Sequence, residues 1–269
     1  MLSLPAFCKG SKVIPETREL RDGKMNQMVL IDCRLPVECR LKLKEHGLEP
    51  IALPPFGKIA APVEAHPDML VYRQGNALLV PAEYLDANRR LFSALDCEVR
   101  GVDASFGPVY PEDVRLNALA MGHTVYGLAR GVCREIRENA PRFVPVRQGY
   151  TRCSAAVVAE RAVITADAGL ADALRRDGID VLLIRPGYIL LSGYDTGFIG
   201  GSGGLIRKGL YGFFGRIREH PQYDEMAGFA EAHGTSLISL CDGVLTDWGG
   251  LVSVPQSLSK TVSCVHGTA

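Results

Sequence analysis

The chain has 269 residues, enough for one large domain or two small ones, and 47% of them are hydrophobic, so it can bury a sizeable core. Its 30 basic and 30 acidic residues balance, which excludes an overall electrostatic attraction to nucleic acid or to an anionic membrane. No stretch approaches the roughly 18 to 20 apolar residues of a membrane-spanning helix. We therefore expect neither nucleic acid nor a membrane as a partner.

The first elements of the chain are a buried strand at 29–32, a helix from 36 to 45 and a strand at 49–53. Pro36 in the first turn of the helix and Gly47 just beyond its last residue are typical of helix ends. Apolar runs bounded by turn residues predict the two strands.

Four further groups of elements follow, each with two strands, a helix and a third strand. The paired strands are predicted at 66–71 with 76–80, 116–121 with 124–128, 153–158 with 162–165, and 198–206 with 210–214. The helix and the third strand are predicted at 81–95 with 97–102, 129–139 with 142–146, 168–176 with 179–184, and 221–233 with 236–240. Residues 188–191 are predicted to extend the edge of the fourth group, and 244–254 to form a last strand.

The order of strand, strand, helix and strand recurs about every 40 to 50 residues, as expected of a repeat architecture. The first group lacks its leading strand, and the segment at 244–254 can supply it, so that both ends of the chain meet in one unit and close a ring. We expect an N-terminal extension at 1–27, a single domain at 28–255 and a tail at 256–269.

This ring of five ββαβ units resembles the pentein superfamily, an α/β propeller around a central channel. The superfamily includes arginine deiminases, amidinotransferases, dimethylarginine hydrolases, agmatine deiminases and a ribosome anti-association factor. The Tyr-Thr-x-Cys segment at 150–153 and the Gly-Phe-Ile-Gly-Gly segment at 197–201 also resemble an uncharacterised bacterial family. A doubly wound α/β sheet is the alternative, but it does not account for the paired short strands before each helix.

The repeat also predicts which side chains face the channel, because the first strand of each unit lines it. Asp68 lies eight residues before Asn76, Cys153 lies eight before Arg161, and Gly200 lies eight before Lys208. Asn117 departs from this count by two residues. Because side chains alternate along a strand, a shift of two residues keeps Asn117 on the same face. The predicted channel set is therefore Asp68 with His66, Asn117, Cys153 and Gly200.

A cysteine, a histidine and carboxylates around a narrow channel can support covalent catalysis by a thiolate. The resemblance implies Cys153 as nucleophile and His66 and Asp68 as its catalytic partners. We predict Asn117 and Asp195 as polar groups that bind the substrate. In the glycine run at 197–204 we assign substrate contacts to Gly200, Gly201 and Ser202, through close approach of the backbone or an anion held by its amides.

Two features depart from the pentein pattern. Catalytic pentein cysteines lie near the C-terminus, so Cys264 competes with Cys153, and the usual Glu-Gly-Gly-Asp and His-x-Asp motifs are absent from their usual places. Each candidate also has a structural alternative, with Cys153 as a core residue and Asp68 and Asp195 as turn caps.

The eight cysteines, at positions 8, 33, 39, 97, 133, 153, 241 and 264, form no Cys-x-x-Cys pair. The spacing predicts no zinc site, and we expect no metal or other cofactor. A chain of this length does not need disulfides, and the N-terminus shows no convincing signal peptide. We expect a cytoplasmic protein with reduced cysteines, of which five fill apolar faces or strand ends: Cys33, Cys39, Cys97, Cys133 and Cys241.

The sequence thus favours a cysteine-dependent hydrolase or transferase acting on a small guanidino, amidino or related C–N substrate. A non-catalytic pentein-like binding module is the alternative, and a nucleotide-binding doubly wound domain is a third class. A homodimer is left open.

Overall fold

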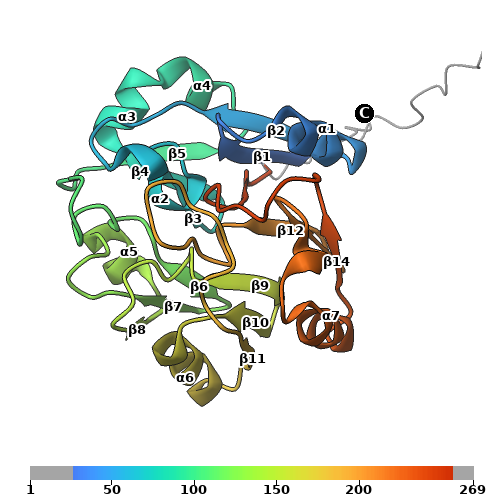
Figure 1. The fold of residues 1–269 in the computed structure, drawn as a ribbon. Helices are drawn as coiled ribbons and strands as arrows, with labels where there is room; N and C mark the ends of the chain where they lie inside the picture. The colour runs from blue at the N-terminus through green and yellow to red at the C-terminus, as the bar shows by residue number, and fades with distance from the viewer. Residues whose placement is uncertain (1–26, 257–269) are drawn as a thin grey trace, which may run out of the picture.

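The computed structural model describes residues 27–256 and has five small three-stranded sheets arranged around a common centre (Figure 1). In each sheet the first strand pairs antiparallel with the second, and the second pairs parallel with the third. The second and third strands are joined through a helix. The predicted five ββαβ units are therefore confirmed.

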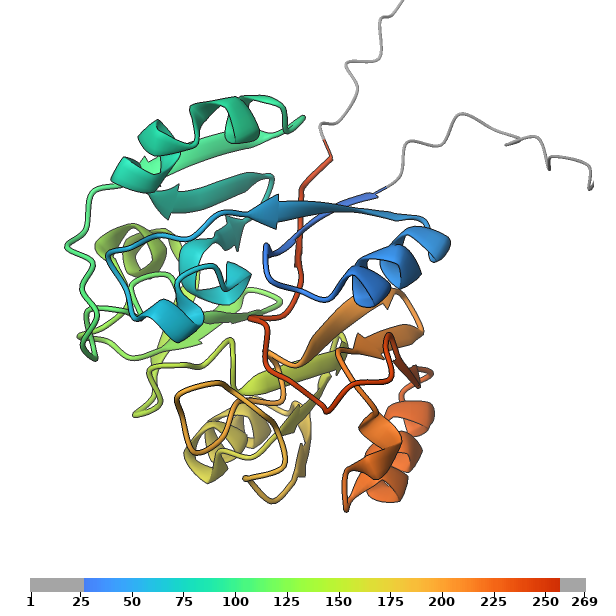
Figure 2. The same ribbon diagram turned by 45° about the horizontal axis from the view of Figure 1, so that its top comes forward.

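The first unit contains β1 (Gln27–Asp32), α1 (Val37–Glu45) and β2 (Leu48–Leu53). Its leading strand is β15 (Val252–Ser253), which pairs antiparallel with β1 (Figure 2). The two ends of the described chain therefore meet in one sheet, as predicted. The last strand is much shorter than the expected 244–254.

The other four units follow in chain order. The second has β3 (Tyr72–Gln74), β4 (Ala77–Pro81), α3 (Ala82–Ala87), α4 (Arg89–Ser93) and β5 (Glu98–Val102). The third has β6 (Leu119–Met121), β7 (Thr124–Gly127), α5 (Arg134–Asn139) and β8 (Arg142–Pro145). The fourth has β9 (Ala155–Ala159), β10 (Ala162–Thr165), α6 (Ala168–Arg176) and β11 (Asp180–Leu183). The fifth has β12 (Gly203–Arg207), β13 (Leu210–Phe213), α7 (Tyr223–Ala232) and β14 (Ser236–Ser239).

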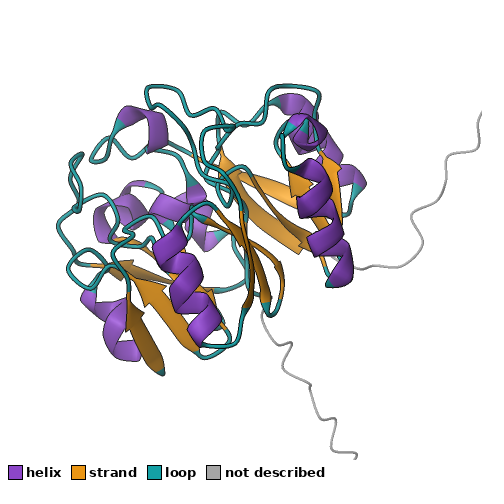
Figure 3. Cartoon of the chain, turned by 60° about the horizontal axis from the view of Figure 1, so that its bottom comes forward, coloured by secondary structure: helices purple, strands orange, loops and turns teal. Residues whose placement is uncertain are grey.

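The first strands lie toward the centre, and helices such as α1, α6 and α7 lie at the periphery (Figures 1 and 3). The middle strands β4, β10 and β13 are buried along their whole length. Such strands consist of apolar residues without alternation because both of their faces are covered. The second strands of these three units therefore have a stronger apolar signal in the sequence than the first strands.

Several predicted elements differ in the structure. The strand predicted at 66–71 is instead a short helix, α2 (Pro67–Leu70), because Pro67 occupies the first helical position, where its missing N–H costs nothing. The helix predicted at 81–95 is divided at Asn88, and the predicted strand at 188–191 is reduced to a single bridge between Leu190 and Thr246. Short 3-10 helices occur at Ala61–Val63 and Ile217–Glu219.

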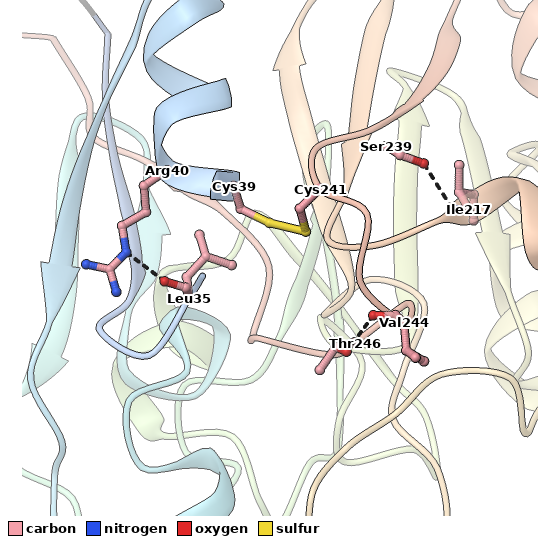
Figure 4. Close-up of a disulfide and its surroundings, with 8 residues drawn as sticks. All are labelled: Leu35, Cys39, Arg40, Ile217, Ser239, Cys241, Val244 and Thr246. Atoms are coloured by element: carbon pink, nitrogen blue, oxygen red, sulfur yellow. Dashed lines mark hydrogen bonds between the residues drawn. A yellow bond between two sulfur atoms is a disulfide. The ribbon is translucent and has the colours of Figure 1, made fainter. Parts of the chain in front are cut away.

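The prediction for Cys39 and Cys241 was wrong, because the structure joins them in a disulfide (Figure 4). Cys39 lies in α1 and Cys241 follows β14, with 5.3 Å between their Cα atoms. The two residues are 202 positions apart in sequence. The closed ring brings the first and fifth units together, a proximity that the sequence alone does not show.

Within residues 27–256, none of the helices has both the length and the apolar character needed to cross a membrane.

Candidate active site

The candidate side chains gather at the end of the sheets where the first strands begin. Asn117 and Cys153 each lie two residues before the first strand of their unit, and Asp68 lies in α2, just before β3. Each of these three side chains is at least 97% buried. The structure therefore brings the predicted channel residues of three units together in the interior.

The amide of Asn117 holds the centre of the cluster. Its Nδ2 donates a hydrogen bond to Cys153 Sγ at 2.8 Å and to the Asp68 carbonyl oxygen at 3.1 Å. Its Oδ1 accepts a hydrogen bond of 2.8 Å from the Arg152 backbone N–H. The side chain is thus satisfied on both sides, which fixes its orientation toward the thiol.

The carboxyl group of Asp68 lies beside the Cys153 thiol, close enough for each group to shift the pKa of the other. Neither Asp68 oxygen accepts a hydrogen bond of ordinary geometry from the described residues. Burial raises the pKa of Asp68 to about 6, against the opposing influence of the Cys153 contact and the Arg152 charge. Burial, reinforced by Asp68, raises the pKa of the Cys153 thiol well above its usual value. The thiol is therefore protonated at neutral pH in this state.

His66 lies between two other aspartates rather than against the thiol. Its Nε2 is 3.8 Å from Asp32 Oδ2, and its Nδ1 is 3.6 Å from Asp247 Oδ1. Burial lowers the pKa of His66, while the two carboxylates oppose that effect. Its Nε2 makes no hydrogen bond with the part of the chain that the structure describes, so this ring nitrogen can exchange a proton with a ligand or water.

Asp247 and Asp32 were not among the predicted site residues. Asp247 accepts hydrogen bonds of 2.9 Å from the backbone N–H groups of Phe198 and Gly249, and burial raises its pKa to about 6. Asp32 accepts from Arg34 through the backbone N–H at 2.7 Å and the guanidinium at 2.7 and 3.0 Å. Asp247 lies two residues before the Gly249-Gly250 pair in the segment expected to lead the first unit, which is the sequence signal that points to it. Asp32 carries a weaker signal, a carboxylate that ends the buried strand β1.

The glycine run packs its backbone against the cluster. A Cβ on Gly200 would overlap the Cys153 and Ala155 carbonyl groups, and one on Gly201 would overlap the Asp247 carboxylate. The Gly201 N–H donates to the Cys153 carbonyl oxygen at 3.1 Å. The backbone of the run therefore lies directly against the cluster, and its contacts with a substrate stay a prediction. Ser202 is buried, and its hydroxyl donates to the Ile199 carbonyl oxygen at 2.8 Å.

One predicted candidate, Asp195, lies away from the cluster. Asp195 is exposed on the connection between β11 and β12 and makes no hydrogen bond or ion pair with the described residues of the cluster. Asp247, unlike Asp195, is a carboxylate that lies in the interior beside His66. Cys264 lies outside the described residues. Within 27–256 there is also no group of three His, Cys, Asp or Glu side chains placed to hold a metal ion.

The arrangement places a thiol, an imidazole and carboxyl groups together in a region closed to solvent. The unpartnered carboxyl oxygens of Asp68 and the free nitrogen of His66 leave acceptor and proton-transfer capacity for a bound molecule. Two buried carboxyl groups, Asp68 and Asp247, pair with no lysine or arginine among the described residues. Such a site is suited to a small cationic group that carries several N–H donors.

Comparison with solved structures places the fold among known proteins. The agmatine deiminase of C. jejuni aligns with a TM-score of 0.52 and 11% identity, covering 87% of this chain and 94% of that chain. The inosamine-phosphate amidinotransferase of Streptomyces griseus aligns with a TM-score of 0.51 and 14% identity, covering 81% and 78%. A dimethylarginine dimethylaminohydrolase from Pseudomonas aeruginosa, in complex with citrulline, aligns with a TM-score of 0.47 and 9% identity, covering 80% and 92%. The alignments with the agmatine deiminase and the amidinotransferase show that the protein has the pentein fold.

Sequence comparison identifies the family. No curated protein matches the sequence. The model of a family of unknown function, DUF6873, matches residues 30–252, which include all five units apart from the outermost residues of the first. The chain therefore belongs to the DUF6873 family of proteins of unknown function and gives that family a pentein fold.

Proposed function

We propose that this protein is a cysteine-dependent hydrolase or transferase that acts on a guanidino, amidino or related C–N group of a small molecule. The observation that carries the proposal is the convergence of Cys153, Asn117 and Asp68 in one buried cluster, with His66 held nearby by Asp32 and Asp247. The similar structures named as an agmatine deiminase and an amidinotransferase give it independent support.

The charge distribution favours a cationic substrate. A guanidinium or amidinium placed against Asp68 and Asp247 would provide the positive charge and N–H donors that these carboxyl groups lack. The same cation beside Cys153 would lower the pKa of the thiol, since an adjacent positive charge favours the thiolate. A bound cation would in this way oppose the effect of burial, which raises the pKa of the Cys153 thiol.

The proposed reaction uses the three groups in turn. The Cys153 thiol gives its proton to Asp68, and the thiolate attacks the central carbon of the C–N group to form a C–S bond. The C–N bond then breaks, and the departing amine takes a proton supplied through His66 or Asp68. Water, or an acceptor amine in a transferase, attacks the carbon and gives a proton to His66 or Asp68, the C–S bond breaks, and the thiolate is regenerated.

Alkylation with a charge-matched pair of reagents tests this proposal. We would compare cationic chloroacetamidine with neutral chloroacetamide, mapping the modified cysteines by mass spectrometry and dividing each rate by that of free N-acetylcysteine. Cys153 is expected to favour the cation by about tenfold or more after this correction, because buried carboxylates raise the local concentration of cations. Asp68→Asn should reduce that preference.

Cys133 supplies the matched control, because it is a buried free cysteine outside the cluster, and its pKa is raised by burial to about 12. It should show no preference for the cation. A screen of guanidino and amidino compounds for release of ammonia or amine follows, in which Cys153→Ser abolishes turnover and Cys133→Ser retains it. Equal preference at Cys153 and in free N-acetylcysteine would overturn the assignment.

One observation favours the non-catalytic binding module as the second candidate. The Cys153 side chain is almost completely buried and its thiol pKa is raised well above the usual value, as in a structural core cysteine. In that case Cys153 reacts with neither reagent until the protein unfolds.

A further inference from the structure

A second candidate site lies farther along the ring axis from the Cys153 cluster. A cavity of about 270 Å³ is lined by residues of the first strands of all five units, β3, β6, β9, β12 and β15. The cluster described above lies where these strands begin, whereas the cavity lies along the strands themselves. Neither Cys153 nor Asp68 lines it.

The charge of the cavity is opposite to that of the cluster. Arg73 and Arg152 line the cavity, and no acidic side chain does. Neither arginine forms an ion pair with a described residue. Arg152 is half-buried, and its guanidinium donates only two long hydrogen bonds, to the carbonyl oxygens of Ala155 at 3.4 Å and Leu251 at 3.3 Å. A guanidinium has five N–H donors, so most of the donor capacity of Arg152 is unused.

Tyr211 adds an unpartnered donor to the same cavity. Its side chain is 1% exposed, and its hydroxyl has no hydrogen-bond partner among residues 27–256. Burial raises the pKa of this phenol, and the nearby Arg152 charge opposes that shift, so the hydroxyl keeps its proton at neutral pH. A buried hydroxyl without a partner is costly, which makes an oxygen acceptor the natural occupant of the adjoining space.

The remaining wall is largely aliphatic and includes Val71, Leu116 and Leu251. An inorganic anion would leave this surface uncovered, whereas a carboxylate with a short apolar body would satisfy both the donors and the wall. The volume lies just below the usual range for ligand pockets, which begins at about 300 Å³, so the occupant must be small.

We propose that this cavity binds the carboxylate group of a small aliphatic molecule through Arg152 and Tyr211, at a site distinct from the Cys153 cluster. The proposal does not depend on the chemistry at Cys153. The two sites nevertheless adjoin, because the Arg152 backbone N–H holds Asn117 and the Arg152 charge acts on Asp68. A carboxylate bound in the cavity would therefore change the electrostatic environment of the Cys153 thiol.

Ligand-observed saturation-transfer NMR with the full chain tests the site. The probes are pentanoate, its neutral isostere pentanamide, and inorganic phosphate. Pentanoate should bind saturably, and pentanamide about tenfold or more weakly, because a hydrogen bond to a charged group contributes more than one between neutral groups. Arg152→Gln should weaken pentanoate by about tenfold or more, and Tyr211→Phe by several-fold.

Arg207→Gln is the matched control, since Arg207 is an exposed arginine on β12 that does not line the cavity, and its affinity for pentanoate should equal that of the wild type. Tyr211→Phe removes one unpartnered hydroxyl and leaves the ring packing intact, so it tests the site even where Arg152→Gln fails to fold. Equal binding of pentanoate and pentanamide, no saturable binding of pentanoate, or unchanged affinity in folded Arg152→Gln and Tyr211→Phe would each overturn the proposal. Phosphate binding more tightly than pentanoate would overturn the assignment of a carboxylate.

Discussion

Asp68 and Asp247 place two carboxyl groups in the interior without a lysine or arginine paired to either among the described residues. Burial raises the pKa of each to about 6, so both groups hold a proton over a pH range in which an exposed aspartate is ionised. This is a cost to folding at neutral pH. We infer that the two buried carboxyl groups serve binding, because a cationic ligand would pair with them and offset the unfavourable free energy of their burial.

The cost can be measured through its pH dependence. The folded protein binds more protons than the unfolded chain between about pH 4 and pH 6, so the unfolding free energy should fall as pH rises through this interval. Asp68→Asn does not titrate, so it should gain stability relative to the wild type over the same interval, by up to about 3 kcal/mol for a shift of about two pKa units. Urea unfolding at pH 4.5 and 7.5, followed by fluorescence of the single tryptophan, Trp248, measures both values.

Asp195→Asn is the control for this experiment, because it removes the charge of an exposed carboxylate outside the cluster. Its stability should parallel that of the wild type at both pH values. A constant difference between Asp68→Asn and the wild type would contradict the raised pKa of Asp68.

At the scale of elements, the segment between β14 and β15 organises the site although it contains little regular structure. It carries Asp247, and the backbone N–H groups of Trp248 and Gly250 donate to the Gly201 carbonyl oxygen at 3.0 and 2.8 Å. The Gly249 carbonyl oxygen accepts from the Asp68 N–H at 3.1 Å. This one segment therefore connects the glycine run to the carboxyl groups.

Gly249 is the position in this segment least tolerant of a side chain. Its φ of +73° lies in the left-handed region, and a Cβ there would overlap the backbone and Cβ of His66. We expect Gly249→Ala to lower the unfolding free energy by about 1 kcal/mol through φ and by roughly 1 to 3 kcal/mol more through the overlap. Urea unfolding gives the total.

Gly47→Ala separates the two contributions. Gly47 has a similar φ of +80° after α1, but a Cβ there would meet nothing within 4 Å. This variant should lose only about 1 kcal/mol. Equal losses in the two variants would show that His66 is free to move and that the segment does not hold it.

At the scale of the whole molecule, both ends of the described chain meet in the first sheet. The Gln27 side-chain amide donates to the Val254 carbonyl oxygen at 2.6 Å, and the Val254 N–H donates to the Met28 carbonyl oxygen at 2.9 Å. The disulfide between Cys39 and Cys241 joins the first unit to the fifth. The ring is thus closed by strand pairing and by a covalent bond.

A circular permutant tests this closure. Residue 256 would be joined to residue 27 by a short flexible linker, with new ends at the exposed hairpin turn between Gly75 and Asn76. Because the ends lie in one sheet and the turn is exposed, this permutant should unfold cooperatively near the wild-type temperature. Opening the chain between the buried Gly200 and Gly201 should instead abolish cooperative thermal unfolding, and similar stability of the two permutants would contradict the arrangement.

The sequence predicted the repeat because the second strand, helix and third strand of each unit have strong apolar patterns. It failed at the first strands, which are short and are preceded by a helix at 67–70 and by turns at 199–202 where strand was predicted. These segments are selected by what they contact across the ring, and contacts between units leave no local pattern. The roles of Cys153, His66, Asp68 and the other site residues remain predictions.

By itself the sequence determined the number of units, the order of elements within them and the joining of both chain ends in one unit, because hydrophobic periodicity and turn residues act over short range. The tertiary structure alone decided that Asp32 and Asp247 flank His66, that Cys39 forms a disulfide with Cys241, and that Asp195 lies outside the Cys153 cluster. Those relations depend on how five units twist and pack around one axis. Burial then sets the pKa values of Asp68, Asp247 and Cys153, and burial is a property of the assembled ring.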